Sequence, residues 1–173
     1  MMAKRNRYFY GKLLTIDDFQ DEQDYWLNKD RMHNRFLHGY GVASGLKVEV
    51  QGGQVTVQPG AAIDGEGNFI EVPSPQSASL PDLGKEIYIC VAYVETLTDF
   101  IPTPNSGETS GDDTEASRIM EGFHISFEDS DPCHTCSSTG IGCGERHPVP
   151  IGRLRRGRGG WRVDNRYFAP SCN

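Results

Sequence analysis

The spacing of hydrophobic and polar residues changes once along the chain, from a helical repeat before residue 40 to a two-residue alternation after it. From Asp17 to about Leu37 the sequence lacks glycine and proline, and apolar side chains recur every three or four positions. Thr15 is a suitable N-cap, and Gly39 is a suitable helix stop. The pattern predicts one long amphipathic helix with an apolar stripe of Phe19, Trp26, His33 and Leu37, widened by Tyr25, Met32 and Phe36.

The rest of the chain has the alternation and turn residues of antiparallel β-structure. The expected strands are residues 46–50, 55–57, 61–63, 69–72, 86–100, 119–127, 149–154 and 161–163. The strand at 86–100 is rich in Ile, Val and Tyr, which predicts a central position. The glycine-rich segment Asp64–Asn68 reads as a hairpin turn.

These elements predict an α+β fold: an N-terminal arm and a long amphipathic helix, followed by a mainly antiparallel β-domain with a Cys/His metal loop. Residues 1–45 are expected to form the arm and helix and to serve docking and oligomerisation. Residues 46–173 are expected to form the β-domain, with a flexible acidic loop at 103–116 and a zinc loop at 133–147.

Charge and composition narrow the classes of function. A net charge of -7 argues against general binding to nucleic acid or to an anionic membrane, and no apolar run reaches the roughly 20 residues of a membrane span. Basic residues gather near both ends and acidic ones between Glu108 and Asp131, a pattern that serves either solubility or contact with charged neighbours. The start of the sequence has no apolar signal segment, so synthesis in the cytoplasm is expected.

Four of the chemistry-bearing residues lie close together in the sequence. Cys133 and Cys136 form a C-x2-C pair, and Cys143 and His147 follow within a short glycine-containing stretch. Three thiolates and one imidazole match a closed tetrahedral site, which predicts structural Zn²⁺. Free thiols and a disulfide are the alternatives, and His134 or Cys172 could replace His147 as the fourth ligand.

Other motifs do not point to catalysis. A catalytic zinc would need an open coordination position and a base, and Glu145 is the sole carboxylate within the cysteine stretch. The glycines at 39, 41 and 45 follow a helix rather than a strand, which is the wrong order for a nucleotide loop. Cys90 lies in an apolar strand and is expected in the core. No catalytic residues are predicted.

Three stretches carry a resemblance: Arg5–Leu14, the helix end Asn34–Gly39 with Gly41–Leu46, and Val55–Gly65. The first two resemble small proteins encoded among the genes of contractile injection systems and phage-like tails, and the third is similar to the β-module of phage baseplate and tail-fibre proteins. The closing segment, Val149–Leu154 followed by Trp161–Asp164, is similar to the last strands of baseplate and tail-fibre modules. The resemblance implies a non-enzymatic, often homotrimeric part of a baseplate, spike periphery or fibre.

The sequence therefore predicts a structural component or adaptor of a contractile injection system or phage-like tail, with other baseplate, fibre or spike proteins as partners. It is expected to form a homo-oligomer, to bind no nucleic acid and to end up in a phage-tail-like particle, with extracellular release left open. The aromatic arm, Tyr8 to Tyr10, is expected either to pack on the chain's own core or to anchor in a partner. A zinc-dependent hydrolase and a carbohydrate- or receptor-binding module using Trp161 are the alternatives.

Overall fold

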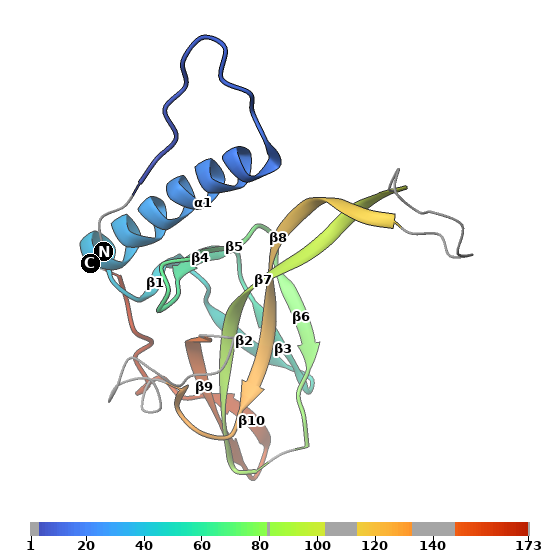
Figure 1. Ribbon diagram of the computed structural model, residues 1–173. Helices are drawn as coiled ribbons and strands as arrows, with labels where there is room; N and C mark the ends of the chain where they lie inside the picture. The colour runs from blue at the N-terminus through green and yellow to red at the C-terminus, as the bar shows by residue number, and fades with distance from the viewer. Residues whose placement is uncertain (1–3, 83, 103–113, 133–147, 173) are drawn as a thin grey trace.

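The computed structural model describes residues 4–82, 84–102, 114–132 and 148–172. An extended arm leads into helix α1 (Ile16–His33), which continues as the π-helical turn η1 (Asn34–His38). The strands described after it are β1 (Gly41–Gly45), β2 (Val48–Gln51), β3 (Gln54–Val57), β4 (Gly60–Ile63), β5 (Phe69–Val72), β6 (Gln76–Ser79), β7 (Glu86–Pro102), β8 (Thr114–Glu128), β9 (Val149–Gly157) and β10 (Gly160–Val163). They form sheets with the orders β1-β4-β5, β2-β3-β6 and β10-β9-β7-β8 (Figure 1).

The predicted α+β fold class is wrong. α1 has only 18 residues, and the chain continues as a five-residue π-helical turn. None of the residues of α1 or η1 is buried, so the predicted apolar stripe does not pack on the sheets. A helical period places side chains on one face but does not determine what covers that face. The observed fold is a body of antiparallel sheets, here called the β-body, with one peripheral helix.

The structure does not test the predicted metal loop. Residues 133–147 lie outside the described residues, as do residues 103–113 of the predicted acidic loop. Within the described ranges, no group of three or more His, Cys, Asp and Glu side chains could hold a metal ion.

The predicted hairpins are confirmed. β2 pairs with β3, β4 with β5 and β9 with β10, all antiparallel. β7 pairs with β9 on one side and with β8 on the other, which gives it the central position that its sequence predicted. Beyond the body, β7 and β8 continue together as a projecting two-stranded ribbon (Figure 1).

The hydrophobic core lies where the β7–β9 sheet faces the two smaller sheets. Alternate residues of β7 point into it, and Cys90 on the intervening position is also fully buried, as predicted. The core is formed by Leu46, Val55, Val57, Ala62, Ile70, Val72, Ile87, Ile89, Val91, Val149, Ile151 and Leu154. The residues are mostly β-branched, which suits a pleated sheet surface packed on one side.

The C-terminal segment covers the free edge of β1. Val42 donates its backbone N–H to the Pro170 carbonyl at 2.7 Å, and its own carbonyl accepts from the N–H of Cys172 at 3.1 Å. Ser171 is bridged to Val42 in the parallel direction. Gly41 allows this close approach, because a Cβ there would lie 2.4 Å from the Pro170 carbonyl oxygen.

Candidate assembly surface

The arm, residues 4–15, turns back on itself at its tip. The backbone N–H of Lys12 donates to the Phe9 carbonyl at 3.1 Å, and Gly11 adopts a φ of 87° that favours glycine. This turn presents Tyr10, whose side chain is fully exposed, and Phe9, which is 62% exposed. The arm aromatics therefore do not pack into the β-body, in contrast to Tyr40, which packs against the core.

Polar contacts fasten the arm along the first half of α1. The Asn6 amide donates to the backbone carbonyl of Asp18, and the Tyr8 hydroxyl donates to the Glu22 carboxylate. Lys12 Nζ lies 2.7 Å from Asp18 Oδ1. The Lys12 ammonium and the Thr15 backbone N–H lower the pKa of Asp18 by stabilising its ionised form.

The start of α1 follows from its sequence. Thr15 and Asp18 form a capping box: the Thr15 hydroxyl accepts from the Asp18 N–H at 3.4 Å, and the Asp18 carboxylate accepts from the Thr15 N–H at 3.1 Å. The other end stops at Gly39, whose N–H donates to the Asn34 carbonyl at 2.9 Å. The predicted N-cap and stop are both confirmed.

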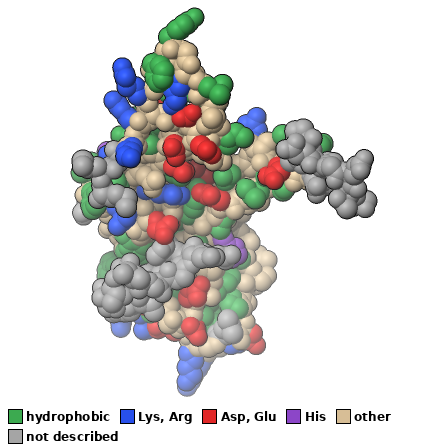
Figure 2. All heavy atoms as spheres, viewed as in Figure 1, with side chains coloured by type: hydrophobic (Ala, Val, Ile, Leu, Met, Phe, Trp, Pro, Cys, Tyr) green, Lys and Arg blue, Asp and Glu red, His purple; other side chains and the backbone are tan. Residues whose placement is uncertain are grey.

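The arm and the helix together expose a large apolar surface, here called the helix surface. Its exposed side chains are Phe9, Tyr10, Leu13, Leu14, Ile16, Phe19, Trp26, Leu27, Met32, Phe36 and Leu37. Figure 2 shows hydrophobic side chains at the tip of the arm and basic ones along its flank. Many exposed large apolar side chains on one arm and helix are typical of a protein–protein interface.

The end of α1 is joined to the β-body through the β4–β5 turn. Gly67 lies directly under the helix backbone, since a Cβ there would be 2.2 Å from the Arg31 carbonyl oxygen. Asn34 Nδ2 donates to the Gly67 carbonyl at 2.9 Å, and Arg31 Nε donates to Asn68 Oδ1 at 2.6 Å. Arg31 also lies 3.5 Å from Glu95 of β7. We call this set of contacts the helix seam.

Asp64 shapes the turn that carries the seam. Its side chain is almost fully buried, and Oδ1 accepts from the N–H groups of Glu66 and Asn68, each at 2.9 Å. Oδ2 accepts from the Asn68 side-chain amide at 2.8 Å. The carboxylate thus holds Asn68 in place for its contact with Arg31. The segment is the hairpin turn that the sequence predicted, but its role as the support of the helix was not anticipated.

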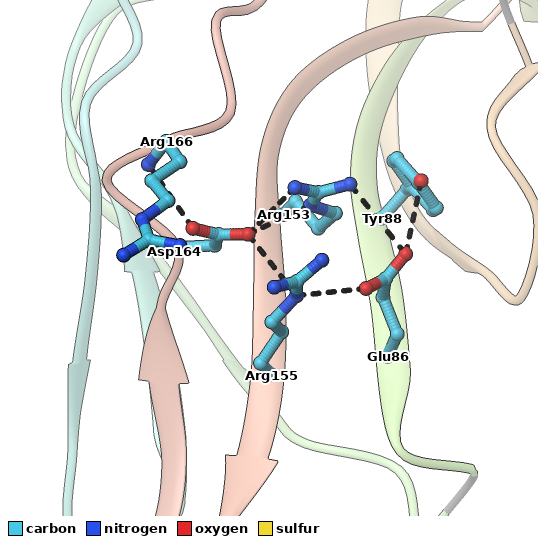
Figure 3. A network of polar contacts seen from close by, with 6 residues as sticks. All are labelled: Glu86, Tyr88, Arg153, Arg155, Asp164 and Arg166. Atoms are coloured by element: carbon cyan, nitrogen blue, oxygen red, sulfur yellow. Dashed lines mark hydrogen bonds and ion pairs between the residues drawn. The ribbon is translucent and has the colours of Figure 1, made fainter.

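A network of charged residues fixes the segment after β10 to the central sheet (Figure 3). Asp164 Oδ2 accepts from Arg153 Nη2 at 2.6 Å, and Arg155 Nε donates to Glu86 Oε2 at 2.8 Å. The Arg166 backbone N–H and the Arg153 guanidinium lower the pKa of Asp164. These charges pair with one another, which is the arrangement of a structural network.

The structure describes only some of the predicted ligands. Cys133, Cys136, Cys143 and His147, together with the alternative His134, lie outside the described residues. Their binding of zinc stays a prediction, which metal analysis of the purified protein would test. The other alternative, Cys172, is half-buried, and its thiol donates to the Gly41 carbonyl at 3.1 Å.

Comparison with known proteins finds similar folds among solved structures. No family model and no curated protein sequence matches the chain. A chain of the TssK–TssF–TssG baseplate subcomplex of the type VI secretion system matches with a TM-score of 0.59 and 13% identity, over 98% of this chain and 62% of that one. The crystal structure of TssK matches with a TM-score of 0.58 and 13% identity, over 98% of this chain and 42% of that one.

The chain has a TssK-like fold. TssK from EAEC, solved in complex with a nanobody, also matches, with a TM-score of 0.53 and 15% identity over 88% of this chain and 55% of that one. This chain thus spans only part of the length of those proteins, and at such low identity the likeness concerns the fold alone. Within the described ranges, α1 and η1 are neither long nor apolar enough to cross a membrane.

Proposed function

We propose that this chain is a structural component of the baseplate of a contractile injection system, and that its helix surface attaches it to neighbouring proteins. One observation carries the proposal: no apolar side chain of α1 or η1 is buried, and Trp26 of α1 and Phe36 of η1 are 57% and 72% exposed. Leaving such groups in water is unfavourable, so a partner surface is expected to bury them.

The fold supports a baseplate as the setting. The solved structures with a similar fold include baseplate assemblies of the type VI secretion system, among them a subcomplex that contains TssK, TssF and TssG. By analogy, the partners of this chain are other baseplate proteins and further copies of itself. Its role in the particle is to join and position neighbours rather than to catalyse a reaction.

The binding-module alternative predicted from the sequence fits the geometry less well. A carbohydrate-binding module needs an exposed aromatic platform, and Trp161 was the proposed residue. Its ring is half-buried against the core, with the Arg156 guanidinium 5.8 Å from the ring centre. The hydrolase alternative depends on ligands that lie outside the described residues.

Replacement of Trp26 by Glu in the full chain tests the proposal. A buried interface tryptophan typically contributes about 2 kcal/mol or more to binding, or roughly thirtyfold in affinity. Incorporation of the variant into sedimented particles, measured by quantitative mass spectrometry, should fall accordingly. The thermal midpoint of the isolated protein should stay unchanged, because Trp26 makes only an edge contact with Tyr25 among the described rings.

Phe168→Glu is the matched control, because Phe168 is 86% exposed and lies outside the arm and helix. It introduces the same charge in place of an exposed aromatic ring and should leave incorporation unchanged. Normal incorporation of the Trp26 variant would show that the helix surface is not the attachment site.

A further inference from the structure

The β-body carries a hollow on the same side as the helix seam. It has a volume of about 290 Å³ and is lined by Phe69, Glu71, Pro73, Tyr93, Glu121, Gly122 and Phe123, which come from β5, β7 and β8. We call it the acidic groove. Its floor is aromatic, and the Phe69 ring is 52% exposed. This volume far exceeds the roughly 30 Å³ that a water molecule occupies, so the groove has room for a side chain.

The carboxylates at the groove are arranged unfavourably for an isolated protein. Glu95 and Glu121 are direct cross-strand partners in the β7–β8 pair. Like charges in that relation repel each other. Among the described residues, one cation is paired with this set: Arg31, at 3.5 Å from Glu95. Neither Glu71 nor Glu121 has an ion-pair partner in the described ranges. The repulsion would be relieved by a cation bound in the groove.

The electrostatics of Tyr93 show the same excess of negative charge. Its hydroxyl donates to Glu95 Oε1 at 3.0 Å. Burial, this hydrogen bond and the nearby Glu121 charge together raise the pKa of Tyr93. Aromatic faces also attract cations, so the ring of Phe69 and the carboxylates favour the same ligand chemistry: a Lys or Arg side chain with an adjacent apolar group.

The arm of the chain carries that chemistry on its outer side. In the extended stretch before the turn, Asn6 and Tyr8 point to α1, where they bond Asp18 and Glu22. The residues that alternate with them, Arg5, Arg7 and Phe9, are here called the outer row. All three are exposed. Arg5 and Arg7 also line the rim of a hollow that the arm forms with Glu22, Tyr25 and Trp26 of α1. Alternate positions are roughly 6.6 Å apart, so the outer row offers two closely spaced cations followed by an aromatic ring.

We propose that the acidic groove receives the outer row of the arm of a second copy of this chain. Arg5 and Arg7 then pair with Glu121 and Glu71, and Phe9 packs on the aromatic floor. The contact joins two different surfaces, so repetition of the same contact closes a ring or continues as a chain of copies. The occupant comes from another copy because each arm is fastened to its own helix through Asn6, Tyr8 and Lys12.

Sedimentation velocity of the purified full chain over a range of concentrations tests this inference without any particle, and so independently of the proposed baseplate role. The wild type should associate reversibly, and raised salt should weaken the association. Glu71→Gln with Glu121→Gln should weaken it at least about tenfold, and Arg5→Gln with Arg7→Gln should do the same. The control pair Glu49→Gln with Glu115→Gln changes the net charge equally on exposed positions and should have no effect.

The decisive variant combines Glu71→Lys and Glu121→Lys with Arg5→Glu and Arg7→Glu. Each reversed pair alone should leave the chain monomeric, whereas the combination should associate again, which also shows that the variants fold. A wild type that stays monomeric at every concentration overturns the proposal. So does an association that the groove variants do not weaken, or one that the combined reversal does not restore.

Discussion

The helix seam predicts that a single methyl group at position 67 will detach α1 from the β-body. Gly67 has a φ of 92°, a conformation that costs a residue with a Cβ about 1–2 kcal/mol. In Gly67→Ala the new Cβ would also lie 2.2 Å from the carbonyl oxygen of Arg31 and 2.8 Å from its carbonyl carbon. These are backbone atoms of a helix, so a rotamer change cannot relieve the clash. Either the turn or the whole end of α1 has to move.

The cost of that movement is the loss of the seam hydrogen bonds. The bond from Asn34 to the Gly67 carbonyl is neutral and contributes about 1 kcal/mol, and the charged bond from Arg31 to Asn68 contributes about 1.5 kcal/mol or more. With the backbone strain, the free energy of unfolding should fall by about 3.5–4.5 kcal/mol. Because α1 buries no side chain, no hydrophobic contact opposes its release.

Gly52→Ala is the control, because Gly52 also has a left-handed φ, 60°, but nothing lies within 4 Å of a Cβ there. The free energy of unfolding of this variant should fall only by the backbone strain, about 1 kcal/mol. Urea unfolding gives the two stabilities, and hydrogen exchange read by mass spectrometry compares α1 with β7. In Gly67→Ala the amides of α1 should lose protection while those of β7 keep theirs. Equal losses in the two variants, or unchanged protection of α1, would refute the reasoning.

Three further predictions concern the β-body. Gly152→Ala should lower the free energy of unfolding by about 1–3 kcal/mol in urea, because its Cβ would lie 2.9 Å from Val48 Cγ2 in a packed interior. Asp164→Asn should lower the urea midpoint at pH 7, because the folded state lowers the pKa of Asp164. This contribution is present above the unfolded pKa of Asp164 and is lost as the pH falls through the lowered folded pKa, so the difference between the variant and the wild type should shrink with acidification. The exposed Asp82→Asn should change the midpoint little. Burial raises the pKa of the Cys172 thiol, so its alkylation by iodoacetamide at mildly alkaline pH should be slower than that of an unfolded control.

Local signals in the sequence predicted the local structure well. Thr15 and Gly39 mark the ends of the helical segment because capping depends on side chains and backbone within a few residues. The hairpins were found for the same reason, since the turn residues and the alternation lie next to each other in the chain. The central place of β7 followed from its unbroken apolar run, which is typical of a strand covered on both sides.

The relations between distant segments could not be predicted in this way. Nothing around Gly67 indicates that a helix more than thirty residues earlier lies on it, because the close approach depends on a missing side chain at Gly67 and on polar side chains that could equally face water. Glu95 and Glu121 become neighbours only through the register of a long hairpin. The apolar face of the helix was predicted to serve docking, with packing on the chain's own sheets as the competing possibility, because a single sequence does not distinguish a face covered by the same chain from one left for a partner.

The C-terminal segment beside β1 limits the ways in which copies of this protein can stick together. An open sheet edge offers unpaired backbone groups to any extended chain and is a common starting point for aggregation. At Val42 both backbone groups are already occupied by residues 170–172. A foreign strand could pair with β1 at this position only after residues 170–172 had dissociated from it. The occupied edge of β1 therefore discourages indiscriminate strand addition, while the exposed apolar side chains of the arm and helix stay accessible.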